Sequence, residues 1–279
     1  MDRNALLTDF YELTMASGYF EQGKRGDTAT FDLYFRHNPF KGGYAIVAGL
    51  EDAVEAVIAT RFSSEDLAFL GSLKSATGGK LFSDDFLNYL ASFRFSGDIM
   101  AIPEGTVVFP NEPLLQVSGN LIECQMVETM LLFHINFQTL VATKAARIWE
   151  AANHGVIIEF GLRRAQGPNG AISACRAAFI GGADGTSNVL GSALHGVPAK
   201  GTHAHSWVQA FGSELEAFRA YACSFPDDCI LLVDTYDTLK SGVPNAILVA
   251  KELEQNGHRL LGIRIDSGDL AFLSRRVSC

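Results

Sequence analysis

Residues 229–234 read CILLVD, an unbroken apolar run that ends in a carboxylate and leads into the polar residues TYD at 235–237. Continuous apolar runs of this kind are typical of strands buried on both faces of a parallel sheet. Four further segments are predicted as strands, although only some of the five are continuous apolar runs, and helix-length stretches lie between them: 156–162, 177–181, 199–202 and 260–266. Alternation of strand and helix indicates a parallel α/β fold. We therefore expect a parallel α/β fold with about five strands.

A different pattern precedes these apolar runs. Apolar and polar residues alternate over 28–36, which predicts a half-buried strand, and a second short apolar segment covers 45–50. Residues 51–92 have a helical pattern, whereas 95–119 are rich in Pro, Gly, Val and Ile and indicate a small antiparallel β unit. Together these elements predict an α+β N-terminal domain over residues 1–120.

A long helix is predicted next, over residues 121–153, where a helical pattern runs without Gly or Pro. It links the N-terminal domain to the α/β part of the chain. We therefore predict a second domain over residues 121–279, which consists of this helix and the parallel α/β part of the chain.

Composition limits the class of protein. The chain has 279 residues, of which 48% are hydrophobic and 19% charged, and its net charge is −9. These values are typical of a globular protein, and the acidic balance argues against nucleic acid or an anionic membrane as the main partner. The five cysteines include no Cys-x-x-Cys pair, which favours reduced thiols. With no signal-peptide pattern and no apolar run of membrane-spanning length, we expect a cytoplasmic location.

Polar residues follow each of the predicted parallel strands. They are Arg163 and Arg164 after the first strand, residues 181–188 after the second, His203, His205 and Ser206 after the third, Asp234 after the fourth, and Asp266 and Ser267 after the fifth. Active sites of α/β barrels form at the carboxyl ends of the strands. Core packing requires no polar groups there, so these positions are the candidates for a functional site.

The first two groups could recognise an anion. Arg163 and Arg164 could form surface ion pairs, or their guanidinium groups could bind carboxylate or phosphate oxygens. The glycine-rich segment 181–185 could be an ordinary turn, or it could bring backbone N–H groups close to an anion. Either pattern alone is weak.

The histidines and carboxylates of the later groups have alternative readings too. A zinc site at His203 and His205 needs a third ligand, and none has suitable spacing. Each could be structural, or one could act as a nucleophile or acid–base group with Asp234 holding its other nitrogen. The turn from Asp266 to Asp269 could bind ribose hydroxyls or water-bound Mg²⁺, or it could cap the helix that follows.

Taken together, seven stretches resemble the nicotinate phosphoribosyltransferase family in that family's order. They are LLTDFY at 6–11, FDLYFRHNPF at 31–40, PLLQVSG at 113–119, GLRRAQGP at 161–168, GTHAHS at 201–206, DTY at 234–236 and RIDSGD at 264–269. The resemblance implies an enzyme that joins nicotinate to phosphoribosyl pyrophosphate, giving nicotinate mononucleotide and pyrophosphate in NAD salvage. It also implies ATP hydrolysis, Mg²⁺ bound through the substrates and a homodimer. For the fold, it implies an α+β domain beside an irregular, TIM-like α/β barrel, which is incomplete here because only about five parallel strands are predicted.

The resemblance further implies roles for individual residues. His205 matches the histidine that ATP phosphorylates, with Asp234 orienting its ring and Asp266 facing the ribose or its Mg²⁺. Tyr11, donated by the partner subunit, stacks on the pyridine ring, and Asp9 lies near the pyrophosphate. The other residues that it places around the substrates are Phe160, Arg163, Arg164, Ser206, Arg264 and Ser267.

Two alternatives stay open. A nicotinamide-preferring phosphoribosyltransferase could use the same scaffold, although the stretches at 161–168 and 201–206 favour the acid. The chain could also be a truncated fragment without catalytic activity. A complete barrel takes about 250 residues, and the family continues beyond the RIDSGD turn, so we expect the barrel to be truncated at the C-terminal end.

An unclosed barrel exposes a strand edge and apolar faces. We therefore predict that the isolated chain is poorly soluble or inactive unless a complementing fragment supplies the remaining strands. Size-exclusion chromatography and a turnover assay check this. A monodisperse, soluble chain with full turnover would refute it.

Overall fold

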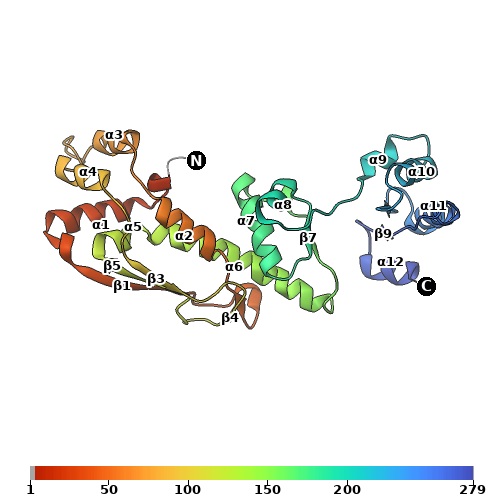
Figure 1. Cartoon of the computed structure of the whole chain (residues 1–279), viewed down its shortest axis with the longest axis horizontal. Helices are drawn as coiled ribbons and strands as arrows, with labels where there is room; N and C mark the ends of the chain where they lie inside the picture. Colours follow the sequence, from red (N-terminus) through yellow and green to blue (C-terminus); the bar gives the residue numbers. More distant parts are fainter. Residues whose placement is uncertain (1–3, 279) are drawn as a thin grey trace. The chain divides into compact units, whose positions relative to one another are not determined.

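The strand predicted over 28–36 and the antiparallel β unit predicted over 95–119 together form a three-stranded sheet in the order β1-β5-β3 (Figure 1). In the computed structural model, which describes residues 4–278, Phe31 in β1 lies opposite Val117 in β5, and Val117 lies opposite Ile99 in β3. A separate pair joins β2 to β4. The bounds of these strands are β1 Thr28–Leu33, β2 Ala45–Ile46, β3 Asp98–Ala101, β4 Val107–Val108 and β5 Leu115–Asn120.

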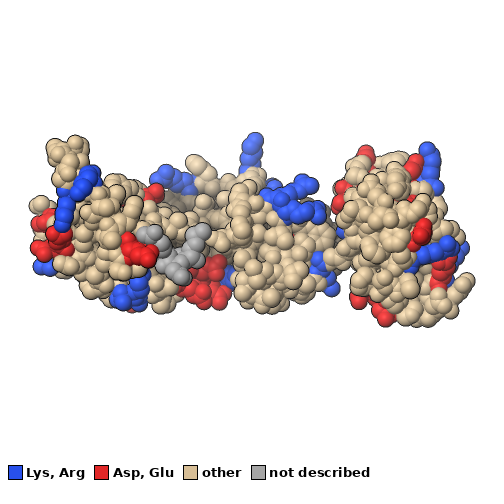
Figure 2. Space-filling view, turned by 90° about the horizontal axis from the view of Figure 1, so that it is seen from above, with Lys and Arg blue, Asp and Glu red and all other residues tan. Residues whose placement is uncertain are grey.

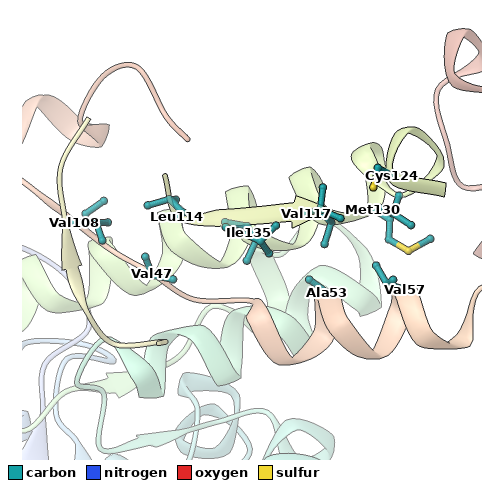
Figure 3. Packing of buried hydrophobic residues seen from close by; sticks show 13 residues of the cluster. Val47, Ala53, Val57, Val108, Leu114, Val117, Cys124, Met130 and Ile135 are labelled. Carbon is teal, nitrogen blue, oxygen red and sulfur yellow. The ribbon is translucent and has the colours of Figure 1, made fainter. Parts of the chain in front are cut away.

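Helices form two apolar cores in this part of the chain. Those that pack against the sheet are α2 Leu50–Ala59, α5 Leu121–Met126 and α6 Glu128–Ala151, whereas α1 Phe10–Glu21, α3 Ser64–Ser72 and α4 Asp84–Ala91 form a second core with α5. Figure 3 shows Ala53 and Val57 of α2 facing Val117 of β5 and Ile135 of α6. Each of these side chains is at most 4% exposed, so β5, α2 and α6 share one apolar core.

The long helix predicted over 121–153 is present but interrupted. Val127 separates α5 from α6, and the Asn120 side chain caps α5 by accepting hydrogen bonds from the amides of Ile122 and Glu123. The chain divides into two compact units, Met1–Ala199 and Lys200–Cys279. The predicted domain limit after residue 120 therefore falls inside the first unit, because α5 and α6 pack against the N-terminal sheet and α2.

The first unit also contains a short parallel pair, β6 (Ile158–Glu159) with β7 (Gly185–Thr186). The strand predicted over 199–202 is reduced to one parallel bridge between Thr186 and Ala199. Two helices accompany the pair, α7 (Gly167–Ile180) and α8 (Val189–His195).

The strand predicted over 177–181 was wrong, because those residues form the end of α7 and Gly181 beyond it. Ala171, Cys175 and Ala178 are buried at helical spacing, and alanine is the strongest helix former. A short apolar run does not by itself distinguish a buried strand from a buried helix. The true strand, β7, begins four residues after Gly181.

The second unit is built on the parallel pair β8 (Ile230–Leu232) and β9 (Gly262–Arg264). Its helices are α9 His205–Gln209, α10 Glu214–Ser224, the π-helix η5 Thr238–Gly242, α11 Val243–Gln255 and α12 Leu270–Val277. Gly242 lies so close to β8 that a Cβ atom there would be 1.8 Å from the carbonyl oxygen of Val233. The mixed α/β class is thus confirmed, with one parallel pair in each unit.

Charged side chains are interspersed on the face of the molecule drawn in Figure 2, where small acidic and basic groups lie among uncharged residues. Among residues 4–278, no helix is long and apolar enough to span a membrane.

One polar cluster connects three elements of the first unit. The Glu104 carboxylate, between β3 and β4, accepts hydrogen bonds from the amides of Gly49 and Leu50 at the start of α2. It also accepts two from Arg176 of α7, at 2.8 and 2.7 Å. Burial alone would raise the pKa of Glu104, but the bonds from Arg176 outweigh it and hold the pKa below its ordinary value.

We predict that Glu104→Ala lowers the free energy of unfolding by about 2–4 kcal/mol, because two amides lose their acceptor and the half-buried Arg176 keeps only its ion pair with Glu51. Urea unfolding followed by circular dichroism measures this. The matched control is Glu112→Ala, which removes an exposed carboxylate from the same part of the chain. Equal stability of the two variants would contradict the prediction.

Candidate active site

The carboxyl ends of β8 and β9 bring together residues that are distant in sequence. The amide of Val233 donates to the carbonyl of Arg264 at 3.0 Å and extends the parallel pairing by one residue. Asp234 therefore leaves β8 at the level where Asp266 leaves β9. Helix α9 begins at His205 and presents its ring at the same end.

A histidine–aspartate pair forms the centre of this site. Nε2 of His205 lies 3.2 Å from Oδ1 of Asp234. The Asp234 side chain is 2% exposed, whereas that of His205 is 39% exposed. Nδ1 of His205 has no hydrogen-bond partner within residues 4–278, so this nitrogen is free to meet a ligand.

The second oxygen of Asp234 is held from the β9 side. Oδ2 accepts hydrogen bonds from the Asp266 amide at 2.9 Å and the Ser267 hydroxyl at 2.6 Å. Burial alone would raise the pKa of Asp234, but these two bonds and the His205 ring outweigh it and lower the pKa. Asp234 is therefore an anion at neutral pH and can stabilise a positive charge on His205.

Arg264 lies beside this pair, and only some of the N–H groups of its guanidinium make hydrogen bonds. Its Nη1 donates to the Thr202 hydroxyl, and its Nε lies 3.7 Å from Oδ1 of Asp266. Nε is buried and makes no hydrogen bond. The guanidinium thus faces an exposed carboxylate and retains unused donors, as a group that binds anionic substrates requires. Ser206, the next residue after His205, is exposed on α9.

His203 has a structural role. Its ring is buried against Phe218 and Tyr221, and Nε2 accepts a hydrogen bond from the Leu232 amide at 3.2 Å. A nitrogen that accepts a hydrogen bond carries no proton, so His203 is neutral. Burial lowers its pKa below the ordinary 6.5. Of the two histidines considered from the sequence, His205 is the one available for chemistry.

Asp9 and Tyr11 lie at the start of α1 in the first unit. The Asp9 amide donates to Thr129 Oγ1, and the Tyr11 hydroxyl donates to Oε1 of Glu128 at 2.9 Å. Burial, followed by the bond to Glu128, raises the pKa of Tyr11 to about 12. Its side chain is 44% exposed, so the neutral ring is available to a ligand or a second chain.

Phe160, Arg163 and Arg164 follow β6 in the first unit, and all three are exposed. Neither arginine makes an ion pair within residues 4–278, so the alternative of a surface ion pair is not observed. The segment 181–185 was interpreted as a possible anion-binding loop, but its amides at 181–184 donate to backbone carbonyls of the chain. That interpretation was wrong for these groups.

Two partners escaped the sequence analysis. Thr202 holds Arg264, and Glu128 holds Tyr11, although neither residue was singled out. Because Thr202 lies inside the GTHAHS stretch, the sequence contained a signal that could have identified it. Glu128 is 117 residues from Tyr11, and no sequence pattern indicated their contact. Within residues 4–278, no group of three or more His, Cys, Asp or Glu residues could hold a metal ion.

Known structures share this fold. The human nicotinic acid phosphoribosyltransferase structure aligns with a TM-score of 0.86 and 37% identity, covering 97% of this chain and 63% of that one. A nicotinate-nucleotide pyrophosphorylase from Pyrococcus furiosus aligns with a TM-score of 0.73 and 25% identity, covering 99% and 62%. The fold is therefore one that occurs in enzymes named for nicotinate and its nucleotide.

Sequence comparison identifies the family. Residues 6–136 match the nicotinate phosphoribosyltransferase N-terminal domain. A nicotinate phosphoribosyltransferase of Dictyostelium discoideum is 43% identical across 97% of this chain and 52% of its own length. One from Mycobacterium tuberculosis is 47% identical across 97% of this chain and 56% of its own length. The chain belongs to the nicotinate phosphoribosyltransferase family, as its motifs predicted, and spans just over half the length of these curated relatives.

His203 generates a prediction about stability and pH. Because the pKa of His203 is lower in the folded chain than in the unfolded one, the unfolded state binds protons more readily as the pH falls. The contribution of neutral His203 to the free energy of unfolding is therefore fully present above about pH 6.5. It declines as the pH falls towards the pKa of His203 in the folded chain.

We expect His203→Ala to lower the free energy of unfolding by about 1–3 kcal/mol at pH 7.5, because the Leu232 amide loses its acceptor. This difference from the parent chain should shrink at pH 5. Trp207 fluorescence in a Trp149→Phe background follows unfolding of the second unit. A difference that does not change with pH would show that His203 is not neutral in the fold.

Proposed function

We propose that this chain carries the phosphorylated histidine and the substrate-binding residues of a nicotinate phosphoribosyltransferase. The reaction joins nicotinate to C1 of the ribose of phosphoribosyl pyrophosphate. It gives nicotinate mononucleotide and pyrophosphate with hydrolysis of ATP, as an entry step of NAD salvage. The observation that carries the proposal is the pair of His205 and buried, ionised Asp234 in a chain of this family.

The geometry suits transfer of a phosphoryl group to His205. Asp234 accepts a hydrogen bond from Nε2–H, which keeps the proton on Nε2 and leaves the lone pair on Nδ1 for attack. As Nδ1 bonds to the γ-phosphorus of ATP, the bond from that phosphorus to the bridging oxygen breaks and ADP leaves. The ring gains positive charge, which the adjacent carboxylate stabilises. Water later takes the phosphoryl group and restores the histidine.

Transfer of the ribosyl group needs charge of both signs. The C1–oxygen bond to pyrophosphate breaks while the pyridine nitrogen bonds to C1, so positive charge develops on the ribose and negative charge on the leaving group. We assign Asp266 to the ribose and Asp9 to the neighbourhood of the pyrophosphate. The anionic parts of the substrates are assigned to Arg163, Arg164 and Arg264, and the pyridine ring to Tyr11, Phe160, Ser206 and Ser267.

Mg²⁺ fits this scheme as an ion that arrives with the substrate phosphates. It prefers oxygen ligands and retains several waters, and Asp266 offers an exposed carboxylate at the strand ends. When bound, the ion neutralises developing charge on the phosphates. The residues of the chain then orient the substrates and hold the proton on Nε2 of His205.

The same proposal extends to architecture and location. The fold would include an irregular α/β barrel, and the functional protein would be a homodimer in which the partner subunit supplies Tyr11. The exposed ring of Tyr11 supports this arrangement. Cys124, Cys175, Cys223 and Cys229 are free thiols, which supports the cytoplasm as the compartment.

Incubation with γ-labelled ATP and Mg²⁺ tests the phosphorylation step. We expect label on His205, none in His205→Ala, and a rate lower by roughly 10- to 100-fold in Asp234→Asn, because the hydrogen bond to a charged partner is lost. Peptide mapping by mass spectrometry locates the label. Turnover assays with nicotinate and with nicotinamide then determine which base is used, and we expect the acid.

The chain offers a matched control, because His258 forms a similar but exposed pair with Asp227, at 2.8 Å. His258→Ala and Asp227→Asn should leave labelling unchanged. The proposal fails if His205→Ala is labelled as strongly as the parent chain.

A further inference from the structure

We propose that Ser267 is a positioning residue that fixes the Asp234 carboxylate, and through it the His205 ring, rather than a residue that binds substrate. This inference rests on the proposed role of His205. It changes the assignment of Ser267 from the pyridine pocket to the support of the nucleophile.

The two oxygens of the Asp234 carboxylate have different hydrogen-bond partners. Oδ1 faces Nε2 of His205 at 3.2 Å, and Oδ2 receives the Ser267 hydroxyl at 2.6 Å and the Asp266 amide at 2.9 Å. A serine hydroxyl has one hydrogen to donate. Because Ser267 gives that hydrogen to Asp234, it cannot at the same time donate to a substrate.

The turn gives Ser267 no competing structural task. The helix that follows, α12, is capped by Asp269, whose side chain accepts from the Phe272 amide at 2.9 Å. Ser267 is therefore not needed to start this helix. Its only side-chain hydrogen bond within residues 4–278 is the one to Asp234.

A buried carboxylate requires this support for a physical reason. Asp234 has a side chain that is 2% exposed, so water does not solvate it, and its charge depends on donors from the protein. Two donors on Oδ2 also stop the carboxylate from rotating about its Cβ–Cγ bond. Without Ser267, one amide remains on Oδ2, and Oδ1 no longer has a fixed direction towards His205.

The test compares Ser267→Ala, Ser267→Thr and the control Ser274→Ala, which removes an exposed hydroxyl from α12. The first measurement is the rate of His205 phosphorylation by ATP with Mg²⁺ over a range of pH. The second is the titration of the Asp234 carboxyl by ¹³C NMR, with Asp234→Asn as the assignment control. The second measurement does not depend on activity.

We expect Ser267→Ala to lower the phosphorylation rate at saturating ATP by about tenfold, with little change in KM for ATP. The titration midpoint of Asp234 should rise, and the acidic limb of the rate profile should move to higher pH with it. Ser267→Thr keeps the hydroxyl and should restore all three properties. Ser274→Ala should match the parent chain.

Two results would overturn the inference. One is an Asp234 titration that is the same in Ser267→Ala and the parent chain. The other is a higher KM in Ser267→Ala with an unchanged rate at saturation, which would identify Ser267 as a substrate ligand. If the parent chain is never labelled on His205, the proposed function is wrong, whereas the Asp234 titration still decides the role of Ser267.

Discussion

A buried carboxylate that water does not reach needs hydrogen-bond donors from the protein. Asp234 has three, which are His205 on α9 and Asp266 and Ser267 in the turn after β9. Its charge draws the β9 turn towards β8 through Asp266 and Ser267, and it draws α9 inward through His205. Burying that charge without these partners would cost several kcal/mol or more. The same contacts that satisfy Asp234 therefore assemble the candidate active site.

Outside the candidate active site, hydrogen bonds from buried side chains link elements that longer strands would otherwise join through backbone hydrogen bonds. The parallel strands of both units are only two or three residues long, so few ladder hydrogen bonds hold them. His203 supplies an acceptor to Leu232 on β8, and Glu104 joins the loop after β3 to α2 and α7. These buried polar groups stabilise the fold mainly because leaving any of them unpaired is costly.

The chemistry available at the candidate active site depends on the different solvent exposure of the Asp234 and His205 side chains. Asp234 is closed off and ionised, whereas His205 is open to ligands at Nδ1 and Arg264 retains free donors. A histidine whose Nε2 is held by a buried carboxylate and whose Nδ1 makes no hydrogen bond within residues 4–278 is consistent with the phosphoryl transfer that we propose. In the first unit, Tyr11 and Arg163 likewise expose an aromatic ring and an unpaired guanidinium.

The sequence by itself determined the family, the mixed α/β class and the pairing of His205 with Asp234, because motif order and apolar runs ending in polar residues are local signals. It failed at 177–181, where a short apolar run in an alanine-rich segment is equally suited to a buried helix. Only the tertiary structure decided that Ser267 and Thr202 support Asp234 and Arg264, and that His203 is a neutral acceptor. Such roles depend on which atoms meet across β8 and β9, and residue type and spacing do not specify that.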